Sequence, residues 1–172
     1  NGNNTVVLNG NGTQEISGDS SFHFYQLVID KNAGDLTLYQ SIDVINDLVF
    51  NAGNLDLNNY DLNLGITGSL INESSGSKIL NTFGLVKATR LFSGTSISND
   101  QAGLGFYIQT SNNFSFTDIK RGHTEQTGAG DGSVKRYWDL SPSNTGLSVD
   151  AIKLHYFHDD LDGIPQNELS FW

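Results

Sequence analysis

Apolar and polar residues alternate in short groups through the first half of the chain. Between residues 36 and 64 the apolar positions keep a period of two, in the pairs Leu36/Leu38, Ile42/Val44, Leu48/Phe50, Leu55/Leu57 and Leu62/Leu64. This period is typical of a β-strand with one buried face, because successive side chains point to opposite sides of a strand. No stretch shows a sustained helical period with caps. The pattern therefore predicts a succession of short β-strands that share a buried face.

A repeat of 19 residues organises these strands. The segment NAGDLTL at residues 32–38 recurs as NAGNLDL at residues 51–57, and looser echoes begin at Gly68 and Gly84. Asn and Gly readily adopt the left-handed backbone angles of tight turns. Each copy is therefore expected to turn the chain and then to begin a strand.

Two architectures fit this repeat. In a solenoid, or β-helix, each coil stacks its apolar strip on the next and Asn side chains can form ladders at the corners. An antiparallel meander fits as well. We favour the solenoid because the repeat is longer than a hairpin needs and its turn is duplicated almost letter for letter. Residues 5–29 are interpreted as an earlier, degenerate coil, and the solenoid is expected to run to about Ala88.

The second half of the chain has a different pattern of apolar and polar residues. Longer and more aromatic strands are expected over residues 104–110, 114–120, 134–140, 149–158 and from Glu168 onward, separated by loops rich in Gly, Asn and Ser such as residues 127–132 and 141–146. Strands at this spacing without helices between them suggest an antiparallel β-sandwich.

The predicted fold is therefore all-β, with a solenoid-like repeat region at residues 1–90 followed by a β-sandwich module at residues 91–172. The segment 84–91 is expected to cap the solenoid, so that its edge does not template aggregation. Both ends of the sequence are interpreted as truncated, so the chain is expected to be a piece of a longer protein with an incomplete sandwich.

Five short motifs follow one another in the second half: VKATR at 86–90, GLGF at 103–106, RGHTEQTG at 121–128, RYWDLSP at 136–142 and LHYFHDDLDGI at 154–164. In this order they resemble a module of large secreted and cell-surface proteins of Bacteroidota, adhesin-like repeat proteins that are cargo of type IX secretion. The resemblance implies a building block of surface proteins and supplies no catalytic residues. The chain departs from the pattern at Trp138, where Phe or Tyr is more usual, and by stopping at Trp172.

The chain is acidic, which limits the classes of molecule that it is expected to bind. Its 9 Lys and Arg residues against 19 Asp and Glu residues give a net charge of -10 and a pI near 4.5. Nucleic acids and anionic lipids need a concentrated basic face, so neither is an expected partner. No apolar run approaches the roughly 20 residues of a membrane-spanning helix, so no membrane insertion is expected. The absence of Cys and Met favours oxidising surroundings, and thus an extracellular location, secreted or at the cell surface.

The acidic loop HDDLDG at residues 158–163 is the best candidate metal site. An EF-hand register that puts Gly163 at position six puts His158 at position one and Leu169 at position twelve, where carboxylates are needed. A looser calcium site built on Asp160 and Asp162 stays open, against the favoured reading of a solvated turn. No other cofactor is predicted. A zinc site is disfavoured because His155 and His158 point to opposite faces of the expected strand, and His123 lies far away in the sequence.

Two further groups of residues suggest specific contacts. Arg121 or Arg136 is expected to pair with a carboxylate such as Asp139 across two strands and so to fix their register. Tyr137 and Trp138 face opposite sides of one strand, so that one of them could be exposed and stack on sugar rings. The alternative is that both belong to the core and rim of the sandwich.

Catalytic patterns are missing from the sequence. It has no G-x-S-x-G elbow, no Cys and no spaced acid/base pair in a recognisable frame. The expected function is therefore that of a non-enzymatic structural or adhesive module of a large extracellular bacterial protein, with neighbouring domains or subunits of a surface assembly as partners. The alternatives are a carbohydrate-binding module with glycan partners, or a subunit of an extracellular fibre that assembles end to end.

Overall fold

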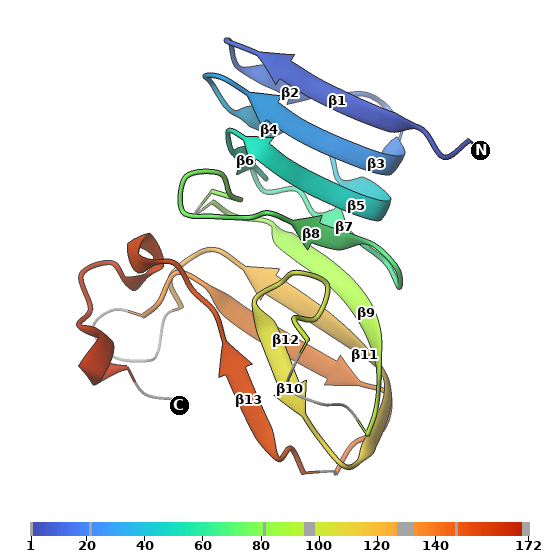
Figure 1. The fold of residues 1–172 in the computed structure, drawn as a ribbon, viewed down its shortest axis with the longest axis vertical. Helices are drawn as coiled ribbons and strands as arrows, with labels where there is room; N and C mark the ends of the chain where they lie inside the picture. The colour runs from blue at the N-terminus through green and yellow to red at the C-terminus, as the bar shows by residue number, and fades with distance from the viewer. Residues whose placement is uncertain are drawn as a thin grey trace.

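The computed structural model describes residues 2–20, 22–80, 82–94, 99–126, 133–146 and 148–169. Within these residues the protein is all-β and contains a solenoid of about 4 turns (Figure 1). The main sheet has the order β1 (Thr5–Gly10), β3 (Phe22–Lys31), β5 (Ile42–Ala52), β7 (Leu62–Asn63), β9 (Leu85–Ser93), β11 (Asn113–Gly122) and β12 (Tyr137–Pro142), with β8 (Ser69–Ile71) also paired to β5. A second sheet contains β2 (Gln14–Ile16), β4 (Leu36–Leu38) and β6 (Leu55–Asp56), and a third contains β10 (Phe106–Gln109) and β13 (Ala151–Leu154).

The first half of the chain forms parallel coils. From β1 to β9 every neighbouring pair in the main sheet is parallel, and so are β2, β4 and β6 in the second sheet. Leu36 of the first repeat copy lies in register with Leu55 of the second. The prediction of a solenoid is confirmed and the meander is excluded, because a meander would have antiparallel neighbours.

The corners of the coils explain the duplicated turn. Gly34 and Gly53 occupy equivalent positions and both have a positive φ, of 70° and 84°. Asn54 donates from Nδ2 to Asp35 Oδ1 at 3.1 Å, and its own Oδ1 accepts from the backbone of Lys78 at 3.3 Å. One polar side chain thus links three successive coils, which is the corner ladder that the repeat predicts.

The interior of the solenoid is a stack of aliphatic rows. Leu27, Leu48 and Leu70 follow one another in register and are buried. On the opposite wall Leu36 and Leu55 are fully buried, and Ile79 bridges to Leu55. Removing this apolar surface from water is the main force that holds the coils together.

Strand β9 belongs to both halves of the molecule. One edge pairs in parallel with β7 at Val86 and Lys87, and the other edge pairs with β11 in the antiparallel sense from Leu85 to Ser93. The strand therefore passes through residue 90 without interruption. The solenoid wall continues into the second half as one hydrogen-bonded sheet (Figure 1).

The antiparallel half has two layers. Strands β9, β11 and β12 form one layer, and the pair β10–β13 forms the other. Phe92 of β9 and Phe106 of β10 pack with ring centroids 6.4 Å apart. Because the described residues place only two strands in the second layer, the predicted sandwich is seen in part.

Several strand boundaries differ from the prediction. The strand expected over residues 149–158 ends at Leu154, and a 3-10 turn, η1 (His158–Leu161), follows it. Glu168 ends a second 3-10 turn, η2 (Gln166–Glu168), rather than beginning a strand. The loop at residues 127–132 and the end at residues 170–172 lie outside the described residues. In the described part of the chain no helix has the length and hydropathy needed to cross a membrane.

Candidate functional site: a buried ion-pair network

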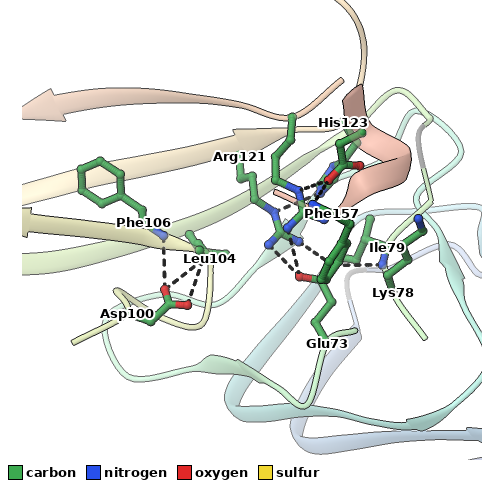
Figure 2. Close-up of polar contacts among 12 residues, drawn as sticks. Glu73, Lys78, Ile79, Asp100, Leu104, Phe106, Arg121, His123 and Phe157 are labelled. Atoms are coloured by element: carbon green, nitrogen blue, oxygen red, sulfur yellow. Dashed lines mark hydrogen bonds and ion pairs between the residues drawn. The ribbon is translucent and has the colours of Figure 1, made fainter. Parts of the chain in front are cut away.

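Charged side chains from four segments meet where the last coil joins the antiparallel half (Figure 2). Glu73 comes from the turn after β8, and Arg121 lies near the end of β11. Arg136 precedes β12, and Asp160 belongs to η1. Together with His123 we call these residues the junction network. Two guanidinium groups and two carboxylates balance one another in charge.

The sheet register explains why Arg121 is buried. The inward-facing row of the main sheet runs through Ile42, Leu62 and Val86 and continues, one partner at a time, to Arg121 and Trp138. The first three side chains of this row are aliphatic and fill the core. At the fourth position the row carries a guanidinium group that is fully buried, so this charge needs a partner inside the protein.

Glu73 supplies that partner. Its two carboxylate oxygens accept from Arg121 Nη1 and Nη2 at 2.8 and 2.9 Å, a two-pronged pairing that is among the strongest hydrogen-bonding arrangements in proteins. Glu73 Oε1 also accepts from the backbone of Ile79 at 3.2 Å. Burial raises the pKa of Glu73, but the charges of Arg121 and Arg136 and these hydrogen bonds outweigh it, so the pKa lies below its usual value. Glu73 is therefore ionised at neutral pH.

Arg136 connects the same carboxylate to the C-terminal 3-10 turn. It lies 3.7 Å from Glu73 Oε2 through Nη1, and 3.1 Å from Asp160 Oδ2 through Nε. Asp160 Oδ2 also accepts from the backbone N–H of Phe157 at 2.8 Å. The Arg136 guanidinium lies 4.4 Å from the centre of the Phe157 ring, a cation–π contact. These contacts hold η1 against the junction.

A salt bridge from the last coil adds to this contact. Lys78 Nζ is 2.7 Å from Asp159 and 5.6 Å from the centre of the Phe157 ring. Lys78 is buried, whereas Asp159 is exposed. The solenoid therefore contacts η1 directly as well as through Arg136.

His123 completes the network as a neutral group. Its Nε2 accepts from Arg121 Nε at 3.0 Å. Burial lowers the pKa of His123 well below its usual value, and the positive charges of Arg121 and Arg136 lower it further. Its Nδ1 has no partner among the described residues, nor does Asp160 Oδ1. His123 thus adds a neutral hydrogen-bond acceptor to the buried charges of the network.

A loop beside the network covers the edge of β8 at its central residue, Leu70. The Asp100 carboxylate accepts from the backbone N–H of Gly105 at 2.9 and 3.0 Å and from that of Phe106 at 3.3 Å. Burial raises the pKa of Asp100, while these backbone bonds lower it and only partly offset the rise. Leu70 of β8 donates its N–H to Ala102 O at 2.9 Å. The loop at residues 101–104 thus occupies the place that a further coil would take.

The two predicted calcium ligands form ion pairs with different cations. Asp160 is buried against Arg136, whereas Asp162 is about half exposed and lies 2.6 Å from Lys135 Nζ. Throughout the described ranges there is no group of three or more His, Cys, Asp or Glu side chains that could hold a metal ion. Calcium binding at Asp160 and Asp162 stays a prediction.

Tyr137 and Trp138 are both half-buried. Trp138 packs against the core and donates from Nε1 to Leu104 O at 2.9 Å. The Tyr137 ring covers Gly122 so closely that a Cβ on this glycine would lie 2.1 Å from it. Glycan stacking on this pair stays a prediction.

The arginines pair with carboxylates, as expected, but the partners are Glu73 and Asp160 rather than Asp139. In the register of β11 and β12, Asp139 lies opposite Lys120, and the two side chains form an exposed ion pair at 3.3 Å. Arg121 is one residue further along and therefore faces inward, opposite Trp138. Period-two alternation from buried Ile119 could have placed Arg121 inside. Nothing in the Ser- and Gly-rich turn around Glu73 marks it as the partner.

The histidines do not form a common site. Strand β13 ends at Leu154, so the expected alternation does not govern His155 and His158. The His155 ring packs edge-on against Phe157 at 5.5 Å, and His158 is exposed at the start of η1. His123 is buried beside Arg121. The structure therefore brings no three of these groups into ligating positions among the described residues.

Comparisons with models of protein families, with curated proteins and with solved structures find no match to this chain. Its function has to follow from its own residues. Within the described residues, the largest gathering of charged side chains is buried, balanced in charge and shared by both halves of the molecule. Such an arrangement can join two parts of a protein firmly.

Proposed function

We propose that the chain is a non-enzymatic structural module of a large extracellular bacterial protein, in which a solenoid and an antiparallel half act as one stiff unit. The junction network is the observation that carries this proposal. Its Arg and Glu side chains are the types that catalytic sites use, yet they are buried and paired with each other.

The continuity of the main sheet supports the proposal. Force applied along the solenoid would pass through β9 into β11, which pair at nine positions from Leu85 to Ser93. A flexible linker between the two halves would instead let them move independently. A module of this kind suits a stalk or a spacer that holds other parts of a protein away from a surface.

The extracellular part of the proposal rests on the sequence. The chain is acidic and contains neither Cys nor Met. It also resembles modules of bacterial surface proteins. Labelling of intact cells with antibodies raised against this module would test the location, and labelling only after cell lysis would contradict it.

Single-molecule force spectroscopy tests the mechanical role. With handles near residues 2 and 169, we expect the wild-type chain to unfold in one main event that includes both halves. In Glu73→Gln, two buried guanidinium groups lose their shared carboxylate, so the antiparallel half should detach first and at a lower force. Asp139→Asn, which removes an exposed ion pair, is the matched control and should behave as wild type. Two independent unfolding events in the wild type would overturn the proposal.

A further inference from the structure

Exposed aromatic side chains gather at the corner where each coil returns from the second sheet to the main sheet. Tyr39 lies between β4 and β5, Tyr60 lies between β6 and β7, and Phe83 precedes β9. Their exposed fractions are 47%, 37% and 68%, so all three rings reach the solvent. Large apolar side chains that are exposed as a group, rather than singly, mark binding surfaces. We call these three residues the aromatic corner.

Hydrogen bonds fix the three coils of the aromatic corner in register. Asn58 Nδ2 donates to Leu38 O at 3.0 Å, and the backbone N–H of Asn59 donates to Phe83 O at 2.9 Å. These bonds place Tyr39 and Phe83 on either side of the middle coil, two strand spacings or about 10 Å apart along the solenoid axis. A surface that is ordered before a ligand arrives loses little conformational entropy on binding.

Polar groups accompany the aromatic rings. Asn59 is exposed on the middle coil, and Tyr39 and Tyr60 each add a hydroxyl group. Lys87, which follows this corner on β9, is already paired with Asp61 at 2.5 Å, and the whole chain carries a net charge of -10. These charges disfavour an anionic ligand. The aromatic corner therefore offers ring faces and neutral hydrogen-bonding groups.

We propose that the aromatic corner binds a neutral, extended polysaccharide of the β-1,4-glucan type, which lies along the solenoid axis. Each pyranose ring of such a chain has a flat face of C–H groups that packs on an aromatic ring, and hydroxyl groups at its edge that bond to amides and phenols. An extended chain fits a straight row of coils, whereas an α-linked chain curves away from it. A protein partner would need a broader apolar surface, because the corner segments 39–41, 58–61 and 82–84 contain no Leu, Ile, Val or Met. This inference does not depend on the proposed structural role, because it concerns the side of the coils.

Isothermal titration calorimetry of the 172-residue chain with cellohexaose tests the site. We expect reversible binding that Tyr39→Ala and Phe83→Ala each weaken at least about fivefold, because each variant removes one stacking surface. Phe116→Ala is the matched control, since this ring is 51% exposed but lies on β11 in the antiparallel half. It should leave the affinity unchanged. Maltohexaose, which joins the same sugar units into a curved α-linked chain, should bind clearly more weakly.

Circular dichroism and melting temperature establish that each variant is folded. A chain that binds no cellohexaose up to the solubility limit of the sugar would overturn the proposal. Binding that both corner variants leave intact would also overturn it, and loss of that binding in Trp138→Ala would place the sugar on β12 instead. Equal affinity for the two hexasaccharides would overturn the preference for an extended chain. All of these results are distinct from the order of unfolding under force, which tests the structural role.

Discussion

The two ends of the solenoid differ in how far other parts of the chain cover them. At the β1 end no strand among the described residues pairs with the outer edge of the first coil, and Val6 and Val7 are 37% and 50% exposed. At the other end β9 pairs with β7, the loop at residues 101–104 bonds to β8, and Glu73 pairs with Arg121. A parallel solenoid would otherwise present an equally open edge at both ends. The antiparallel half therefore covers one end of the solenoid, and it does so through three different contacts: a paired strand, a loop and a buried ion pair.

The largest effect should come from placing a charge inside the stack. Leu55→Asp puts a carboxylate at a position that is 0% exposed, and the cost should be several kcal/mol, enough to unfold the repeat region. Val6→Asp makes a similar change in the open first coil and should cost much less, because water reaches that position. Urea unfolding curves measure both. Equal losses would mean that the first coil is as well covered as the others.

The next largest effect concerns the ion pairs of the covered end. Arg121→Met leaves the buried Glu73 carboxylate with the more distant Arg136 as its one cation among the described residues, and should cost about 3–5 kcal/mol. Lys120→Met, the adjacent residue with an exposed partner, should cost less than about 1 kcal/mol.

A double variant separates pairing from packing at this site. Glu73→Leu combined with Arg121→Met removes both charges and should recover much of the stability lost in the single variant, because no unpaired charge remains at that pair. Chemical denaturation of the four proteins completes the cycle. If the double variant were as unstable as the sum of two single losses, the network would not be held together by mutual pairing.

A smaller effect is expected at the loop that covers β8. Gly103 has a φ of 68°, and a Cβ added there would lie 2.0 Å from Leu70 O. Gly94 has a φ of 62° with nothing within 4 Å of an added Cβ, so Gly94→Ala should cost only the backbone strain of roughly 1–2 kcal/mol. Gly103→Ala should cost clearly more and should raise amide exchange at Leu70, whose hydrogen bond to the loop would break. Equal costs would show that the loop does not press on β8.

The smallest effect is a pH dependence carried by His123. Because its folded pKa is depressed, the unfolded state binds a proton below pH 6.5 that the folded state does not. Stability should therefore fall as the pH drops below about 6.5, by up to about 1.4 kcal/mol per pH unit for one proton. Glu73, whose folded pKa is also lowered, adds a second loss below about pH 4.5.

Histidine variants identify the group responsible for the upper part of this profile. His123→Gln should flatten the fall between pH 6.5 and pH 5, whereas His155→Gln, at an exposed position, should leave it unchanged. Thermal melts across this pH range give the comparison. A profile that His123→Gln does not alter would show that another group causes it.

The repeat region could be predicted from the sequence because each of its turns and buried side chains is specified by residues close together in the chain. The duplicated NAG turns with Gly34 and Gly53, and the period-two leucines that follow them, specify where the chain turns and which side chains face inward. The same alternation applied to β11 places Arg121 on the inner face. The 3-10 turn at residues 158–161 could not be predicted in this way, because its position depends on Asp160 meeting Arg136 and on Lys78 meeting Asp159.

By itself the sequence determined the all-β class, the stacked coils with their corners, and the net negative charge of the chain. The tertiary structure decided which carboxylate meets which arginine and that β9 serves both halves. The physical reason is distance along the chain: Glu73 and Arg121 are 48 residues apart. Their pairing arises only when the sheet register turns Arg121 inward and the last coil brings Glu73 to the same point.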